Sequence, residues 1–211
     1  MTTRSNRLVF SVALAIASLA IASTTAQAQV RGQVQVGSAG VGRVLANFET
    51  MAASGRQFTP DEVLHPENYS RARADSVLDG LERIALTGSN ISLSSSAAQE
   101  LTLAGSVQHA PPHALDRAVR LYRQSKQKHV RNMILSFLPL QKDRARTIAF
   151  LKSVAVQGDQ TADFERAPFR AAESLGQMGP AGRAALIDLR DAKLLRDGDT
   201  IAYVNWFLHT H

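Results

Sequence analysis

Apolar residues recur at intervals of three and four positions along most of the chain after residue 70. Between residues 71 and 86 one such stripe consists of Val77, Leu78, Leu81, Ile84 and Ala85. Similar stripes follow in residues 113–124, 130–138, 143–156, 164–178, 180–195 and 200–208. This spacing is typical of helices that bury one face, and no segment after residue 60 alternates like a strand. The pattern predicts an all-α chain.

Capping motifs place two further helix starts. Thr59 and Glu62 form a capping box, and the short helix they begin ends before Pro66. Ser96 and Gln99 form a second capping box. We therefore expect a helix that begins at Ser96, runs to about residue 104 and follows a serine-rich turn.

The first 28 residues have the three parts of a cleavable secretory signal peptide. Arg4 and Arg7 precede an uncharged apolar run over residues 8–22, and Ala26-Gln27-Ala28 offers small residues for signal peptidase. A spanning helix needs ~20 apolar residues, more than this run supplies. Cleavage after Ala28 and a periplasmic or secreted location are the expectation, and an uncleaved membrane anchor is the alternative.

The rest of the chain divides into two parts. Residues 29–42 are rich in glycine and predict a flexible tether, and residues 43–53 can form one short helix. Residues 29–58 are thus expected to be an N-terminal segment ahead of a helical domain over residues 59–211. No segment after the signal peptide is apolar enough to span a membrane.

Composition narrows the chemistry. The chain has no cysteine, which excludes disulfides, thiolate metal sites, a cysteine nucleophile and a lipid anchor on cysteine. The net charge of the whole chain is +6. It is +4 after residue 28, because the signal peptide holds two arginines and no acidic residue. The distribution of charged residues along the chain therefore says more about a possible partner surface than this modest net charge does.

The apolar stripes repeat along the chain. They begin at Leu78, Leu115, Ile148 and Leu186, so the period is 37, then 33, then 38 residues. Periods of this length are typical of stacked helical repeats, in which about three or more units share one core. An irregular helical bundle with a chance periodicity is the alternative.

The segment from Phe169 to Pro180, FRAAESLGQMGP, resembles the first helix and turn of a HEAT-type repeat. Leu186 and Leu189 fall where the second helix of such a repeat carries buried positions, and Val130-Arg131 resembles the start of the repeat before it. The likeness is clearest over residues 163–196 and weaker over 70–157. It implies a short α-solenoid of three to four antiparallel helix pairs, closed by a C-terminal capping helix.

Candidate catalytic residues do not assemble into a known motif. His109 and His113 have helical metal-ligand spacing, but Pro111 and Pro112 lie between them and prevent that helix. The chain has no Gly-x-Ser-x-Gly elbow, and its glycine-rich segment follows no strand. We expect no enzymatic activity, no cofactor and no metal.

Two surfaces are candidate contacts for a partner. The first is a basic stretch with nine Lys or Arg and one acid between residues 117 and 146. Its candidate patch, hereafter the basic patch, is Arg117, Arg120, Arg123, Lys126, Lys128 and Arg131. The second is aromatic: Tyr203, Trp206 and Phe207 near the C-terminus either close the helical stack or dock a partner.

An exported, non-catalytic helical-repeat scaffold that binds another protein is the function these features favour. The partner is not expected to be nucleic acid, because an exported protein is separated from the nucleic acids of the cytoplasm. Two alternatives stay open. One is a helical enzyme or ligand-binding domain without a known motif, and the other is a basic module that binds an anionic envelope component.

Overall fold

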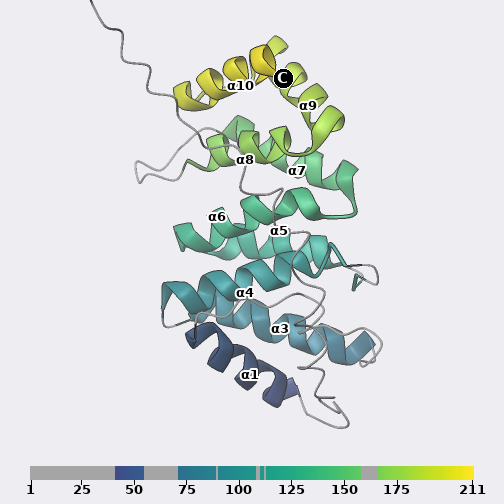
Figure 1. Cartoon of the computed structure of the whole chain (residues 1–211), viewed down its shortest axis with the longest axis vertical. Coiled ribbons are helices and arrows are strands. Elements are labelled where there is room, and N and C mark those ends of the chain that lie inside the picture. Colours follow the sequence, from purple (N-terminus) through teal and green to yellow (C-terminus); the bar gives the residue numbers. More distant parts are fainter. Residues whose placement is uncertain (1–40, 55–70, 89, 108–109, 112, 158–165) are drawn as a thin grey trace, which may run out of the picture. The chain divides into compact units, whose positions relative to one another are not determined.

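A computed structural model describes residues 41–54, 71–88, 90–107, 110–111, 113–157 and 166–211, all within the compact unit Ala39–His211. These described residues form nine α-helices and one 3-10 helix without a strand, which confirms the all-α prediction (Figure 1). The helices are α1 (Val41–Ala53), α3 (Arg71–Thr87), α4 (Ile91–Leu103), α5 (Ala114–Gln124), α6 (Lys128–Phe137), η2 (Leu138–Leu140), α7 (Arg144–Gln157), α8 (Ala167–Gly176), α9 (Gly179–Asp191) and α10 (Gly198–Thr210).

Each helix packs mainly against its neighbours in sequence and against the helix after next. Thus α3 contacts α4 and α5, and α7 contacts α8 and α9. The even-numbered helices make the longer series, in which α4 packs on α6, α6 on α8, and α8 on α10. Helix α1 packs against α3 and α4.

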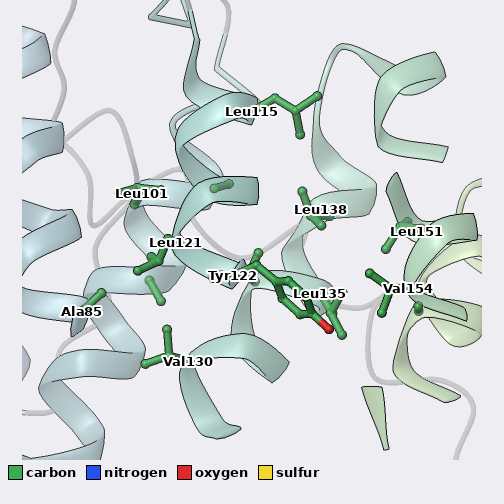
Figure 2. Close-up of a cluster of buried hydrophobic side chains, with 14 of the residues drawn as sticks. Ala85, Leu101, Leu115, Leu121, Tyr122, Val130, Leu135, Leu138, Leu151 and Val154 are labelled. Atoms are coloured by element: carbon green, nitrogen blue, oxygen red, sulfur yellow. The ribbon is translucent and has the colours of Figure 1, made fainter. Parts of the chain in front are cut away.

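One cluster of buried side chains runs through these contacts. Figure 2 shows its middle, where Ala85, Leu101, Leu121, Val130 and Leu151 come from five different helices, α3 to α7. The stripe predicted for α3 is confirmed, since all five of its residues are buried. Burying one leucine side chain stabilises a fold by about 1.5–3 kcal/mol, so this shared core is the main stabilising feature of the described residues.

Polar side chains also join helices inside this core. The Ser174 hydroxyl donates to the Leu135 carbonyl oxygen over 2.8 Å, which ties α8 to α6. The Gln141 side-chain amide donates to the carbonyl oxygen of Thr102. Both donor residues are buried, where a polar group left without a partner costs about 1–3 kcal/mol. These bonds therefore specify how the helices are set against one another.

The start at Ser96 that was predicted for one helix is wrong. Helix α4 begins at Ile91, and its N-cap is Asn90, whose side-chain oxygen accepts from the Leu93 amide over 2.7 Å. The serine-rich segment is therefore helix rather than turn. Its serines adapt to the helix: the Ser94 hydroxyl donates to the Asn90 carbonyl oxygen over 2.9 Å. The capping box at Ser96 gives the wrong start because Asn90, six residues earlier, is also a preferred N-cap residue and caps the helix.

Other helix boundaries shift less. Helix α9 ends at Asp191 rather than near residue 195, because Lys193 takes a left-handed conformation with φ of 53°. Helix α8 ends at Gly176, two residues earlier than predicted. At the N-terminal side, residues 41 and 42 belong to α1 rather than to the predicted tether.

Two glycines allow α8 to pack closely against its neighbours. A Cβ atom at Gly176 would lie 2.7 Å from the Tyr203 hydroxyl oxygen, so this position brings α10 onto α8. A Cβ atom at Gly182 would overlap the Leu175 carbonyl oxygen and lie 2.9 Å from the Met178 Cβ. Helix α9 can cross the end of α8 this closely because Gly182 lacks a side chain.

Some predictions fall outside the described residues. These are the signal peptide with its cleavage site, the tether up to residue 40 and the short helix that begins at Thr59. Among the residues that the structure describes, no helix is both long and apolar enough to cross a membrane.

Candidate functional site

A cleft of about 520 Å³ opens where α8, α9 and α10 meet. Its volume lies in the range of about 300–1,000 Å³ that is usual for ligand sites. We call it the C-terminal cleft; its lining is Glu173, Gly176, Gln177, Gly179, Pro180, Arg183, Tyr203, Phe207 and His211. Two of the three predicted aromatic contact residues, Tyr203 and Phe207, belong to it.

Stacked rings form one wall of the C-terminal cleft. Tyr203, Phe207 and His211 are four residues apart, so they lie on one face of α10. The Phe207 and His211 rings stack with centroids 4.7 Å apart, and those of Tyr203 and Phe207 are 5.9 Å apart. Phe169 on α8 packs edge-on against Tyr203 at 5.3 Å and holds the wall in place. Tyr203 and Phe207 are therefore preorganised by the helix and by Phe169, and this part of the wall needs little ordering when a ligand binds.

Polar groups surround this aromatic wall. The Arg170 guanidinium donates to the Glu173 carboxylate over 2.7 Å, which compensates much of the negative charge at the cleft. Arg183 on α9 donates weakly to the Leu208 carbonyl oxygen at 3.4 Å. The cleft thus combines apolar ring faces with a carboxylate, an amide and a guanidinium, a set suited to an amphipathic peptide segment.

The Tyr203 phenol should lose its proton at a higher pH than an ordinary tyrosine. Burial, together with the nearby Glu173 carboxylate, raises its pKa to about 12 from the ordinary value of 10.0. A raised folded-state pKa stabilises the fold below the unfolded pKa, and that contribution is lost as the pH rises towards 12. In an ultraviolet titration, the wild type minus Tyr203→Phe difference should show a phenolate transition near pH 12. A transition near 10 would mean that the ring is not held against α8.

Two members of the basic patch face acidic residues of α3. Arg120 donates to both carboxylate oxygens of Glu82, over 2.8 and 2.6 Å, and this raises the pKa of the arginine. Arg117 pairs with Asp79 and lies 3.6 Å from Glu82. Both arginines therefore join α5 to α3, and this intramolecular role competes with binding an outside anion.

The other members of the basic patch lie at the end of α5 and along α6. Arg123 and Lys126 are exposed, whereas Lys128 and Arg131 are partly buried. The Arg131 guanidinium lies 5.9 Å from the Tyr122 ring centroid, a cation–π contact. Arg123 and Lys126 are therefore the exposed members of the patch outside the α3–α5 ion network, whereas Arg120 is exposed but pairs with Glu82.

The histidines are spread over the structure. Exposed His113 precedes α5 with φ of 69°, 3.4 Å from Asp116, and His109 is outside the described residues. The Ser94 hydroxyl donates a hydrogen bond to the Asn90 carbonyl oxygen. His129 Nε2 lies 2.8 Å from the oxygen of the same hydroxyl, and this contact ties α6 to α4. Within the described residues, no three His, Asp or Glu side chains lie together as metal ligands need.

Trp206, the third predicted aromatic residue, lies outside the lining of the cleft. Its side chain is 57% exposed and tilts against Tyr203 at 6.0 Å. Glu173, Gln177 and Arg183, which lie beside these aromatic residues in the cleft, were not among the predicted site residues. The four-residue spacing of Tyr203, Phe207 and His211 is the signal that could have identified the stacked wall.

Comparisons of the chain with known protein families, curated proteins and solved structures return no significant match.

Proposed function

We propose that this protein is an exported, non-catalytic scaffold of HEAT-like helical repeats, and that it binds another protein through the C-terminal cleft. The signal-peptide pattern of the first 28 residues supports export to the periplasm or beyond. The observation that carries the binding role is the stacked wall of Tyr203, Phe207 and His211, which lines an open cleft instead of being covered.

The spacing of the polar links supports the repeat architecture. Ser94 and His129 are 35 residues apart, Lys152 and Asp188 are 36 apart, Glu82 and Arg120 are 38 apart, and Leu135 and Ser174 are 39 apart. These separations agree with the period of the apolar stripes. Links between equivalent positions of successive units are what a stack of similar helix pairs requires.

The chemistry of the cleft supports a peptide segment as the bound part of the partner. Rigid ring faces give apolar contact at a low entropic cost, and aromatic residues are enriched among the side chains that dominate binding energy. Gln177 and Pro180 are exposed beside the wall, and Glu173 and Arg183 offer an acceptor and a donor. The partner segment is therefore expected to carry an apolar or aromatic side chain flanked by polar groups.

Site-specific photo-crosslinking in the native host tests this proposal with three exposed glutamines. A photoreactive residue at Gln177 lies in the cleft, one at Gln124 lies beside exposed Arg123, and one at Gln157 ends α7 as a control. We expect one defined protein adduct from position 177. Phe207→Ala should remove that adduct while leaving the circular dichroism spectrum unchanged.

The other two positions give the contradicting outcomes. A protein adduct from position 124 alone would move the partner site to the basic patch. Equal labelling at all three positions, or no protein adduct at position 177, would overturn the binding role of the cleft. A low-molecular-mass adduct at 177 would replace the scaffold with a ligand-binding function.

A further inference from the structure

Helix α10 presents a second, outward surface next to the C-terminal cleft, where the Trp206 ring borders the Tyr203 and His211 rings of the cleft wall at 6.0 and 5.9 Å. Val204 is buried and faces α8 and α9, whereas Ala202, Asn205, Trp206 and His209 are exposed. Trp206 is the large apolar side chain of this outward face, and it is 57% exposed. Tryptophan in such a position is costly to leave in water and is enriched in protein interfaces.

The polar groups at the two ends of α10 are complementary, because a carboxylate accepts hydrogen bonds and an imidazole N–H donates them. Asp199 lies in the first turn of the helix and His209 in the last. A second α10 laid antiparallel across the first brings the start of one helix to the end of the other. If the outward faces of the two helices cross at the level of residue 204, Asp199 faces His209 of the second copy, because the two residues are each five positions from that level.

The same register also matches shape. Ala202 and Trp206 are each two positions from residue 204, so the Trp206 ring of one helix lies over the Ala202 methyl group of the other. The small alanine leaves room for the large indole, and the twofold axis makes the contact twice. One register therefore satisfies both the carboxylate–imidazole pair and the apolar pair.

We propose that the outward face of α10 is a homodimer interface, in which two copies of this chain pair through antiparallel α10 helices. Within the chain, Arg166 lies 3.6 Å from Asp199, and among the described residues this ion pair is the only one that competes for the Asp199 carboxylate. Both of these side chains are more than 60% exposed, so their pairing is weak and does not prevent the dimer contact.

The size of the face sets the expected affinity. Helix α10 has 13 residues and is therefore about 20 Å long. One face of such a helix buries less than the ~800 Å² per partner of a stable complex. The dimer should therefore dissociate on dilution, with a dissociation constant on the order of 10–100 μM.

Sedimentation velocity on the mature chain, from about 1 μM to about 500 μM, measures this association directly. Trp206→Ser should weaken it about tenfold or more. Ile91→Ser removes an apolar side chain at the start of α4 that is 66% exposed, more than Trp206 at 57%, and should leave the association unchanged. Circular dichroism confirms that each variant is folded.

A charge exchange tests the register. Asp199→Lys and His209→Glu should each weaken association, because each places like charges or an unmatched charge across the contact. The double variant should restore it, since a lysine then faces a glutamate. A monomer at every concentration, or a double variant as weak as the single ones, would overturn the proposal. Continued growth beyond a dimer would replace the twofold contact with a head-to-tail one.

Discussion

Replacement of Gly182 with alanine is expected to destabilise the protein by about 2–3 kcal/mol, a large effect for one added methyl group. The new Cβ atom would overlap the Leu175 carbonyl oxygen and stand 2.9 Å from the Leu175 carbonyl carbon, which are backbone atoms that cannot rotate away. Helix α9 must therefore move off the end of α8. The better helix propensity of alanine, about 1 kcal/mol, offsets only part of this cost.

Gly198 provides the matched control. It is the first residue of α10, and no atom lies within 4 Å of the position that its Cβ atom would take. Gly198→Ala should therefore be neutral or stabilising by up to about 1 kcal/mol. Urea unfolding followed by circular dichroism measures both variants. Equal stability of the two alanine variants would show that α8 and α9 are not packed as closely as described.

Hydrogen exchange on Gly182→Ala adds a test of the repeat architecture. In a linear stack each unit touches only its neighbours. The Gly182→Ala substitution should therefore speed amide exchange in α8, α9 and α10, while the amides of α3 and α4 keep their protection. A single cooperative bundle would lose protection throughout the chain. The distribution of the faster-exchanging amides thus separates the two architectures that the sequence alone left open.

Helix positions and buried stripes could be predicted because each depends on local spacing. Leu78, Leu81 and Ala85 are predicted as core residues from three- and four-residue intervals, and all three are buried. The start of α4 was predicted wrongly because two capping signals, Asn90 and Ser96, lie close together. Packing of Ser94 against His129 favours the longer helix, and such a contact is not visible in a local window.

The candidate sites were harder to predict, because they depend on which helices meet. The basic patch was read as one surface from its own segment, without the acids of α3. Yet Asp79 and Glu82 precede Arg117 and Arg120 by 38 residues, close to the repeat period. Applying that period to charged as well as apolar positions would have revealed the pairing. No such rule predicts Glu173 or Arg183 beside Tyr203, since their meeting depends on the crossing of α8, α9 and α10.

Removal of the Glu82 carboxylate should be the other strongly destabilising change. Its side chain is only 12% exposed, and it is held by Arg120 through two hydrogen bonds and approached by Arg117. Glu82→Ala leaves two guanidinium groups facing each other without the carboxylate between them. Breaking a fully buried pair costs about 3–5 kcal/mol; because Arg120 is half exposed, we expect about 2–3 kcal/mol in urea unfolding.

Asp79 is the matched control within the same ion network. Its side chain also pairs with Arg117 but is 66% exposed, so Asp79→Ala should cost less than about 1 kcal/mol, and salt should erase that loss. The loss at Glu82 should persist in salt, because water reaches the carboxylate poorly. A double-mutant cycle between Glu82 and Arg120 should give a coupling of about 1–3 kcal/mol. If the two acidic variants behave alike, the α3–α5 contact is a solvated ion pair, and Arg117 and Arg120 return to the surface available to an anionic partner.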